Sequence, residues 1–556
     1  MNVMKRVGIL LQSIKCNRYL YEMINDLSQN SEIELFFLLN NSKDKKSSLL
    51  NKIKQKGFMD FLSYLFFKIV IILEFKTLSV FLKNIKKHYK ILNIDTLIDN
   101  NSLYLNPNFS KSWIFVQYPI EDIKNIKSLK LDLIIRGNAE GIFRGDILHS
   151  SKEGILSFHH GDNRWNRGGP AGFWEVYQRR ATTGFIIQIL SEELDGGEVI
   201  FRSDIATKRS YTENISFLYT ESYPFMSKIV LDYAKNNSLP TREEPIPYSG
   251  NILKVPTLLE TVKYILNSFS IFSIYFIRRF ILQKRDRWSV SFIKKDWNNA
   301  VLRKGVEIKT PNNRFFADPF IVTRNGKNIC FVEDYSYSSK IGSISAIEIL
   351  NEKNYKILGS VIKEPFHMSF PYIFEYKDEL YMVPETSQAK SIRVYKSINF
   401  PMKWEYQKDL FKDVNATDTI IFKYNSMWWM MFSSSITGKN YNSQLVTYYT
   451  KSDPINGVWI AHTKNPIVNS SAISRNGGIM GLNNNRLIRG RQKQGFNIYG
   501  ASLSLSEIIE LTPSSFKEEE ICQISPNFLP DIKGIHHLHS NGEYTVYDYF
   551  RNERLS

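Results

Sequence analysis

A unit of about 50 residues recurs in the second half of the chain, and this repeat restricts the fold more than any other feature. Each unit has an aspartate or a small polar residue, then an apolar strand, a turn and an aromatic strand. The units begin near residues 315, 368, 416, 471 and 534. Periods of this length with several strands each are typical of β-propellers. We therefore predict an all-β, five-bladed propeller over residues 288–556.

The first half of the chain has a different texture, in which short apolar runs alternate with helical patterns. The clearest apolar runs are Val7–Leu11, Ile33–Leu39, Leu131–Ile135 and Gly154–Phe158, and a helical stretch covers Tyr19–Leu27. This alternation indicates βαβ units and a mostly parallel sheet, in which chemistry collects at the carboxyl ends of the strands. We predict an α/β Rossmann-like domain over residues 1–245, with a helical insertion at about 50–95.

Two apolar helical segments can each be interpreted in two ways. Charged residues interrupt Phe58–Leu82, so we expect amphipathic helices that pack on the domain or lie on a membrane surface. Residues 246–287 form a helical, basic linker, which either packs one domain on the other or rests on anionic lipid. Its basic residues and those just beyond it are Arg278, Arg279, Lys284, Arg285, Arg287, Lys294 and Lys295.

The charge balance and the cysteines limit the partners. The chain carries 72 Lys+Arg against 55 Asp+Glu, a formal net charge of +17, which suits phosphorylated substrates or an anionic membrane surface. Without a long basic block interleaved with aromatics, we expect no nucleic-acid partner. Cys16, Cys330 and Cys522 lie far apart, so we expect a reducing compartment, the cytoplasm, and no metal site.

The segment Leu131–Arg202 carries the most informative motifs. An apolar strand ends at His159, and Arg167-Gly168, Thr183-Gly184 and Leu194-Asp195-Gly196-Gly197 follow in this order. The set resembles the core of the formyltransferase family, which includes methionyl-tRNA, glycinamide-ribonucleotide and sugar-amine formyltransferases. The resemblance covers roughly residues 1–210.

This resemblance implies 10-formyltetrahydrofolate as the formyl donor and His159 and Asp195 as catalytic residues. A histidine at a strand end can stabilise an oxyanion or move a proton, and a carboxylate can fix its protonation state. Ser157 stands where the family pattern has asparagine, and we count Ser157 and Asn138 among the expected catalytic residues. Asn138 or Asn163 is expected to supply the amide that Ser157 lacks. The expected binding residues are Arg136, His160, Asp162, Asn163, Arg164, Arg167, Gly168, Thr183 and Gly196.

The repeat region resembles the propeller at the N-terminus of plant glucosamine inositol phosphorylceramide transferases and, distantly, family-43 glycoside hydrolases. The matching elements are Ala317-Asp318-Pro319, Phe331–Asp334, Pro371-Tyr372, Pro384-Glu385-Thr386 and Thr417-Asp418-Thr419. The resemblance implies a channel lined by Asp318, His367, Glu385, Asp418, Arg475 and His536. Paired carboxylates there could perform acid/base chemistry on a glycosidic bond, or the module only binds a glycan, which we favour.

The sequence therefore predicts a formyltransferase that acts on the amine of an amino sugar in bacterial surface-polysaccharide biosynthesis. We expect the acceptor to be nucleotide-linked or lipid-linked, a glycan to bind the propeller, and the protein to be cytoplasmic or peripheral at the inner membrane. Two alternatives remain. The propeller processes glycans while the formyltransferase domain is a scaffold, or both sites are inert and the protein only binds glycans.

Overall fold

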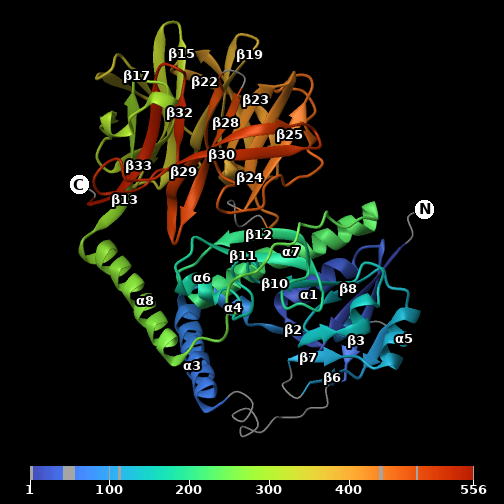
Figure 1. Ribbon diagram of the computed structural model, residues 1–556. Helices are drawn as coiled ribbons and strands as arrows, with labels where there is room; N and C mark the ends of the chain where they lie inside the picture. The colour runs from blue at the N-terminus through green and yellow to red at the C-terminus, as the bar shows by residue number, and fades with distance from the viewer. Residues whose placement is uncertain are drawn as a thin grey trace. The chain divides into compact units, whose positions relative to one another are not determined.

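A computed structural model describes residues 4–41, 57–98, 101–110, 114–437, 443–483 and 486–554. The chain divides into two compact units, Met1–Ile271 and Phe272–Ser556, each considered by itself below. The boundary falls inside helix α8 (Leu258–Phe276), within the segment predicted as a linker. The coarse fold prediction is confirmed, since the first unit is built on an α/β sheet and the second is a β domain (Figure 1).

The first unit is organised around a seven-stranded sheet of order β12-β11-β10-β8-β1-β3-β5. Its strands are β1 (Lys5–Leu11), β3 (Ile33–Asn40), β5 (Ser102–Leu105), β8 (Leu133–Arg136), β10 (Ile155–His159), β11 (Thr182–Ile189) and β12 (Glu198–Ala206). Neighbouring strands from β5 to β10 pair in parallel, whereas β11 and β12 are antiparallel. The carboxyl ends of the parallel strands therefore share one edge, where β8 ends at Arg136 and β10 at His159.

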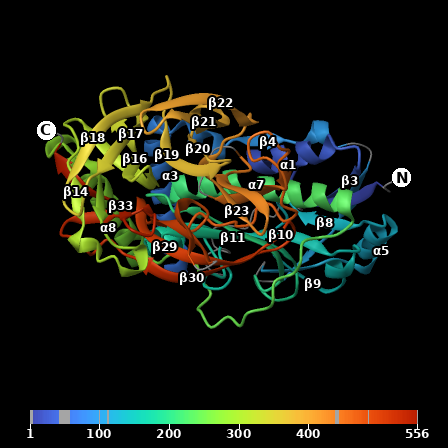
Figure 2. The same ribbon diagram turned by 90° about the horizontal axis from the view of Figure 1, so that it is seen from above.

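Helices cover both faces of this sheet because its strands are apolar on both sides. Leu20 and Ile24 of α1 (Arg18–Ser28) and Met226 and Val230 of α7 (Tyr211–Asn236) belong to one core. Ile126 of α5 (Ile120–Ser128) belongs to the other. Figures 1 and 2 show α7 running along the sheet. The helices are α1 (Arg18–Ser28), α3 (Phe58–Phe81), α4 (Lys83–His88), α5 (Ile120–Ser128), α6 (Phe173–Tyr177) and α7 (Tyr211–Asn236).

Smaller elements complete the first unit. They are β2 (Lys15–Asn17) paired with β4 (Ile91–Asn93), the sheet of β6 (Asn108–Phe109), β7 (Phe115–Gln117) and β9 (Ile142–Arg144), and 3-10 turns at Asp95–Leu97 and Gly145–His149. The predicted helical insertion contains α3, a helix of 24 residues. Among the helices in the described ranges, none combines the length and hydrophobicity needed to span a membrane.

The second unit contains five antiparallel sheets within its described residues, four of them formed by consecutive strands. The first two of these are β15 (Arg314–Arg324), β16 (Lys327–Ser336), β17 (Ile341–Ile349), β18 (Tyr355–Ile362), and β19 (Ser369–Tyr376), β20 (Glu379–Glu385), β21 (Ser391–Asn399), β22 (Lys403–Lys412). The next two are β23 (Thr417–Tyr424), β24 (Met427–Ser434), β25 (Gln444–Thr450), β26 (Ile460–Ala461), and β27 (Asn476–Asn483), β28 (Arg486–Gly495), β29 (Ile498–Leu511), β30 (Phe516–Ile524).

The fifth sheet joins the two ends of this unit. Its strands are β13 (Lys284–Ile293), β14 (Val306–Ile308), β31 (Ile532–Gly534), β32 (Leu538–Ser540) and β33 (Thr545–Arg554). All ten residues of β13 pair with β33, from Lys284 opposite Arg554 to Ile293 opposite Thr545. Among the described residues, β33 is the last strand, and its pairing with β13 joins the end of the second unit to its beginning.

A β-bulge recurs in the first strand of the consecutive sheets. The register shifts after Ala317 in β15, after Ser369 in β19 and after Thr417 in β23. At these bulges Asp318 and Asp418 take left-handed backbone angles, with φ of 50° and 52°. Such angles are uncommon for residues other than glycine and often mark functional positions. The bulge therefore gives Asp318 and Asp418 equivalent backbone positions in their sheets.

Candidate active site

His159 and Asp195 meet at the carboxyl edge of the parallel strands. His159 is the last residue of β10, and Asp195 lies in the loop between β11 and β12. The Nδ1 atom of His159 is 3.3 Å from Oδ1 of Asp195. The backbone N–H of Gly168 donates to Oδ2 of Asp195 at 3.0 Å. Two of the sequence motifs, Arg167-Gly168 and Leu194-Asp195, therefore converge on the histidine.

The second ring nitrogen of His159 fixes the charge state of this pair. Nε2 lies 2.8 Å from the carbonyl oxygen of Asn166, so it must carry a hydrogen and donate it. Nδ1 then also needs a hydrogen to contact the Asp195 carboxylate, which makes the ring an imidazolium. Burial lowers the pKa of His159, but Asp195 and the Asn166 carbonyl outweigh it and the pKa is raised. Burial raises the pKa of Asp195, but His159 and the Gly168 N–H bring it below its ordinary value.

A glycine leaves room for the imidazole. A Cβ atom on Gly161 would lie 2.7 Å from Nε2 of His159, closer than real Cβ contacts allow. His159 itself is only 7% exposed. The ring orientation therefore depends on the absence of a side chain two residues further along the chain.

Asn166 and Glu175, two residues that carry no recognisable motif in the sequence, extend the site into the interior. Asn166 Nδ2 donates to Oε1 of Glu175 at 3.0 Å, and both residues are almost fully buried. Within the described residues, Oε2 of Glu175 and Oδ1 of Asn166 have no hydrogen-bond partner. Burial raises the pKa of Glu175 to about 7. The sequence feature that could have pointed to Glu175 is its position as the one carboxylate among the apolar residues of Phe173–Tyr177.

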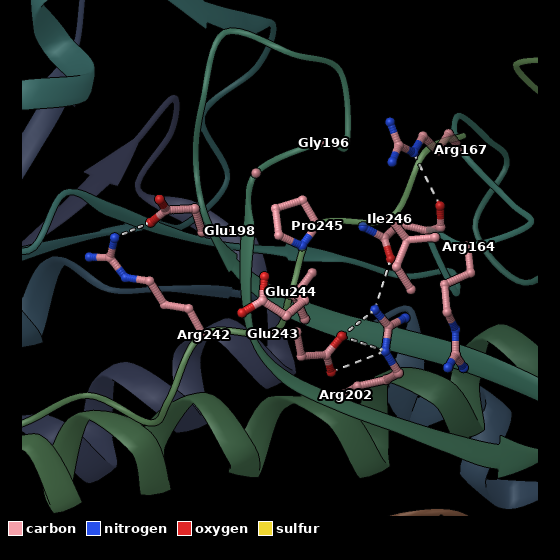
Figure 3. A pocket seen from close by; sticks show the side chains of 13 residues that line it. Arg164, Arg167, Gly196, Glu198, Arg202, Arg242, Glu243, Glu244, Pro245 and Ile246 are labelled. Carbon is pink, nitrogen blue, oxygen red and sulfur yellow. Dashed lines mark hydrogen bonds and ion pairs between the residues drawn. The ribbon is translucent and has the colours of Figure 1, made fainter. Parts of the chain in front are cut away.

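A cavity of about 310 Å³ opens at the loop that carries Asp195. The loop residues Gly196 and Gly197 form part of its wall, and four arginines line it (Figure 3). Its lining residues are Asn163, Arg164, Arg167, Gly196, Gly197, Glu198, Val199, Arg202, Arg242, Glu243, Glu244, Pro245 and Ile246. A cavity of this size suits part of a small-molecule ligand.

The arginines of this cavity differ in their partners. Arg202 contacts Asp162 at 2.7 Å and Glu243 at 2.7 Å, and Arg242 contacts Glu198 at 2.5 Å. Arg164 is paired with Asp162. Arg167 donates to the Asn163 carbonyl (Figure 3). Its guanidinium lies over the ring of Tyr248, and it has no carboxylate partner among the described residues. Arg167 is therefore the cation best placed to meet an anionic ligand.

Asn163 reaches both parts of the site. Its amide nitrogen donates to the carbonyl of Asp195 at 3.3 Å, and its amide oxygen accepts from Arg202 at 3.0 Å. Of the two asparagines expected to replace the family amide, Asn163 is therefore the one in contact with the loop of Asp195.

Asn138 does not take that role. Its amide oxygen accepts from the backbone N–H of Gln12 at 2.8 Å, and its nitrogen donates to the carbonyl of Ser13 at 2.8 Å. The side chain thus ties the loop after β8 to the loop after β1. Arg136 is also used internally, since it donates to the carbonyls of Ala139 and Gly141.

His160 and Thr183 lie away from the cavity, contrary to expectation. His160 directly follows the end of β10, and its ring has other neighbours than that of His159. It packs among Phe158, Tyr219 and Tyr223. Thr183 is fully buried and bonds Thr207 and Asn214.

Ser157 shares the strand face of His159, but it is only 3% exposed. Its hydroxyl donates to the carbonyl of Phe158 at 3.1 Å. The structure therefore does not bring Ser157 to the His159–Asp195 contact.

In the second unit, the predicted residues form two connected groups. Arg475 holds Asp418 through two hydrogen bonds of 2.6 and 2.8 Å and lies 3.7 Å from Glu385. His536 Nδ1 donates to Asp548 at 2.8 Å, and its Nε2 is 3.5 Å from Asp318. The charges of Asp418 and Arg475 both act on Asp318, which links the two groups.

Buried carboxyl groups in this cluster hold protons unusually well. Burial raises the pKa of Asp318 to about 7, helped by Asp548 and Asp418 and opposed by His536. Burial, together with Asp418, raises the pKa of Glu385 to about 7. Glu333, which is not among the predicted channel residues, also has a raised pKa through burial. The sixth predicted residue, His367, lies 3.7 Å from Glu333.

Asp318, His536 and Asp548 offer ligand atoms within 4.8 Å of one another, as a metal site would. The carboxylate of Asp548, however, already accepts from the backbone N–H groups of Asp318, His536 and His537 and from the His536 ring. Hydrogen bonds therefore satisfy this carboxylate without a metal ion.

Comparisons with known proteins agree with both resemblances found in the sequence. The model of the family described as "Glucosamine inositolphosphorylceramide transferase 1, N-terminal" matches residues 297–534. The rice glucosamine inositolphosphorylceramide transferase 1 is 34% identical over 214 residues, which is 37% of this chain and 28% of the rice protein. The chain thus spans less than a third of the length of that relative.

The other resemblance extends to formyltransferases. The methionyl-tRNA formyltransferase of Bacillus subtilis is 26% identical over 146 residues, which is 25% of this chain and 45% of that protein. A sugar N-formyltransferase structure from Shewanella covers 48% of this chain and 88% of its own, with 14% identity and a TM-score of 0.27. The chain therefore combines similarity to formyltransferases with a segment, residues 297–534, that matches the N-terminal family of glucosamine inositolphosphorylceramide transferase 1.

Proposed function

We propose that the first unit transfers a formyl group from 10-formyltetrahydrofolate to the amine of an amino sugar. One observation carries this proposal: His159 pairs with Asp195, and the two glycines that follow Asp195 in the chain line a cavity together with four arginines. The donor supplies a formyl group on a nitrogen that becomes the leaving group. The two glycines after Asp195 suit close approach of a flat ring system to the loop.

The residues of the site have distinct tasks in this reaction. The amine attacks the formyl carbon, a new C–N bond forms, and the bond to the donor nitrogen breaks. Asp195, at 19% side-chain exposure, is more accessible than His159 at 7%, so Asp195 accepts the proton that the amine loses. The positive charge of His159 stabilises the negative charge on the formyl oxygen, and the proton returns from Asp195 to the leaving nitrogen.

Arg167 and the chain's charge suggest how the acceptor is held. A guanidinium with no carboxylate partner among the described residues can bind a phosphate through two parallel hydrogen bonds. The acceptor is then an amino sugar linked to a nucleotide or to a lipid phosphate, as in surface-polysaccharide biosynthesis. The free cysteines are consistent with a cytoplasmic reaction.

For the second unit, we propose a five-bladed propeller over residues 288–556 that binds a glycan, with 246–287 as the linker. The five antiparallel sheets and the pairing of β13 with β33 support it. Acid/base chemistry on a glycosidic bond is a second candidate, favoured by the pKa of about 7 shared by Asp318 and Glu385. In that case Asp318→Asn would abolish turnover of a glycan while its binding persists.

A mass-gain assay tests the formyl transfer. Purified protein is incubated with 10-formyltetrahydrofolate and a panel of nucleotide-linked amino sugars, and gain of one formyl group is followed. His159→Ala and Asp195→Asn are expected to reduce the rate by at least about 100-fold. The exposed His149→Ala serves as the matched control and should retain activity. Full activity in either site variant would refute the proposal.

A further inference from the structure

Two helices of the first unit carry large apolar side chains into solvent. On α3, Ile72 is 52%, Leu73 58%, Val80 72% and Phe81 78% exposed. On α8, Leu259 is 83%, Leu266 63% and Phe269 72% exposed. Soluble proteins rarely expose apolar patches of this extent without a partner. We call these side chains the apolar helix surface.

Both helices are nevertheless held firmly to the unit. Of the described side chains on α3, Phe61, Phe67 and Ser79 are buried, and the Phe67 ring packs edge-on against Phe173 at 5.1 Å. On α8, Thr261 and Tyr264 are buried. The Tyr264 hydroxyl donates to Glu74 of α3, which joins the two helices (Figure 1). The apolar helix surface therefore belongs to the folded unit.

Positive charge flanks this surface. Helix α4 follows α3 directly, and the residue after α4, Tyr89, packs back on α3, with its ring centroid 4.3 Å from that of Phe75. Lys86, Lys87 and Lys90 are exposed there, as are Lys68 and Lys76 on α3 and Lys263 on α8. The acidic residues on the same helices are Asp60, Glu74 and Glu260. Of these, Glu74 accepts hydrogen bonds from the backbone N–H of Thr212 and from the hydroxyl of Tyr264. Glu260 accepts a hydrogen bond from the backbone N–H of Thr257.

We infer that the apolar helix surface docks on an anionic lipid bilayer, with α3 and α8 lying in the interface and the lysines over the headgroups. Apolar side chains with lysine at their border are the pattern of interfacial helices. Each exposed lysine near an anionic leaflet adds to the attraction between the protein and the membrane. A protein partner, in contrast, would not require that the charges around the surface all be positive. This inference does not depend on formyl transfer.

Vesicle flotation with the full chain tests it. The protein is mixed with phosphatidylcholine vesicles, with or without 30% phosphatidylglycerol, and the floated fraction is measured. We expect binding to the anionic vesicles. The double variant Leu266→Glu, Phe269→Glu should reduce the partition coefficient at least about tenfold. Val458→Glu, at a position 79% exposed in the second unit, is the matched control and should bind normally.

A charge-reversal pair tests the lysines separately. Lys86→Glu with Lys87→Glu should weaken binding by about fivefold or more for each lysine, and raised salt should have a similar effect. Lys353→Glu, an exposed lysine of the second unit, is the control. Circular dichroism checks that each variant folds. Absence of binding, or equal binding to neutral vesicles, would overturn the inference. So would a dimer in sedimentation that the apolar variants dissociate, since the occupant would then be a second copy.

Discussion

At the scale of single residues, Glu175 makes a prediction about pH. Its pKa rises from an ordinary 4.5 to about 7 through burial, so between these values the folded protein keeps a proton that the unfolded chain releases. Stability therefore falls as pH rises through this window, by about 3 kcal/mol in all. Glu175→Gln copies the protonated form and should lose that pH dependence.

Denaturant unfolding at pH 5 and pH 8 measures this difference. The wild-type protein should lose stability between the two values, and Glu175→Gln should lose about 3 kcal/mol less. The exposed Glu121→Gln is the control and should follow the wild type. Equal slopes for the wild type and Glu175→Gln would contradict the assignment.

Gly161 makes a second prediction at this scale. A methyl group there would displace the His159 ring, because its Cβ would lie 2.7 Å from Nε2. We expect Gly161→Ala to reduce formyl transfer at least about tenfold, since a small misplacement of a catalytic group is costly. Steady-state kinetics beside a thermal melt measure it. Unchanged turnover in a folded variant would show that the ring orientation is not needed.

At the scale of elements, Tyr264 connects α8 to the rest of the first unit. Its hydroxyl donates to Glu74 of α3 and accepts from the backbone N–H of Tyr211, at the start of α7. Tyr264→Phe removes the hydroxyl and with it both hydrogen bonds, so it should lower the free energy of unfolding by about 1–3 kcal/mol. Chemical denaturation measures the change, with Tyr104→Phe, at a position 61% exposed, as the control. Equal losses in the two variants would argue against this anchor.

The elements themselves were largely readable from the sequence. The runs Val7–Leu11, Ile33–Leu39 and Gly154–Phe158 correspond closely to β1, β3 and β10. Their apolar periodicity is a local property, so it can be recognised without a structure. The bulges at Asp318 and Asp418 were not predicted, because a register shift depends on the partner strand.

At the scale of the whole molecule, the two compact units should unfold separately. Asp548 accepts four hydrogen bonds in the closing sheet of the second unit, so Asp548→Asn should destabilise that unit by several kcal/mol. We expect two calorimetric transitions, of which the variant lowers one. The other transition belongs to the first unit and is identified by the temperature at which formyl transfer is lost. A single transition that shifts as a whole would contradict independent units.

The sequence alone determined the alternation of strands and helices in the first unit and the repeat of the second. Both rest on periodicity, which is a local feature of the chain. The resemblance to formyltransferases implied that His159 and Asp195 belong to one site, and the structure brings the two side chains into contact. Only the tertiary structure decided which polar groups share a cavity. Asn138 and Thr183 were attractive in sequence but are consumed by hydrogen bonds. Glu175 was inconspicuous until burial placed it behind Asn166, because the environment of a carboxylate is set by segments distant in the chain.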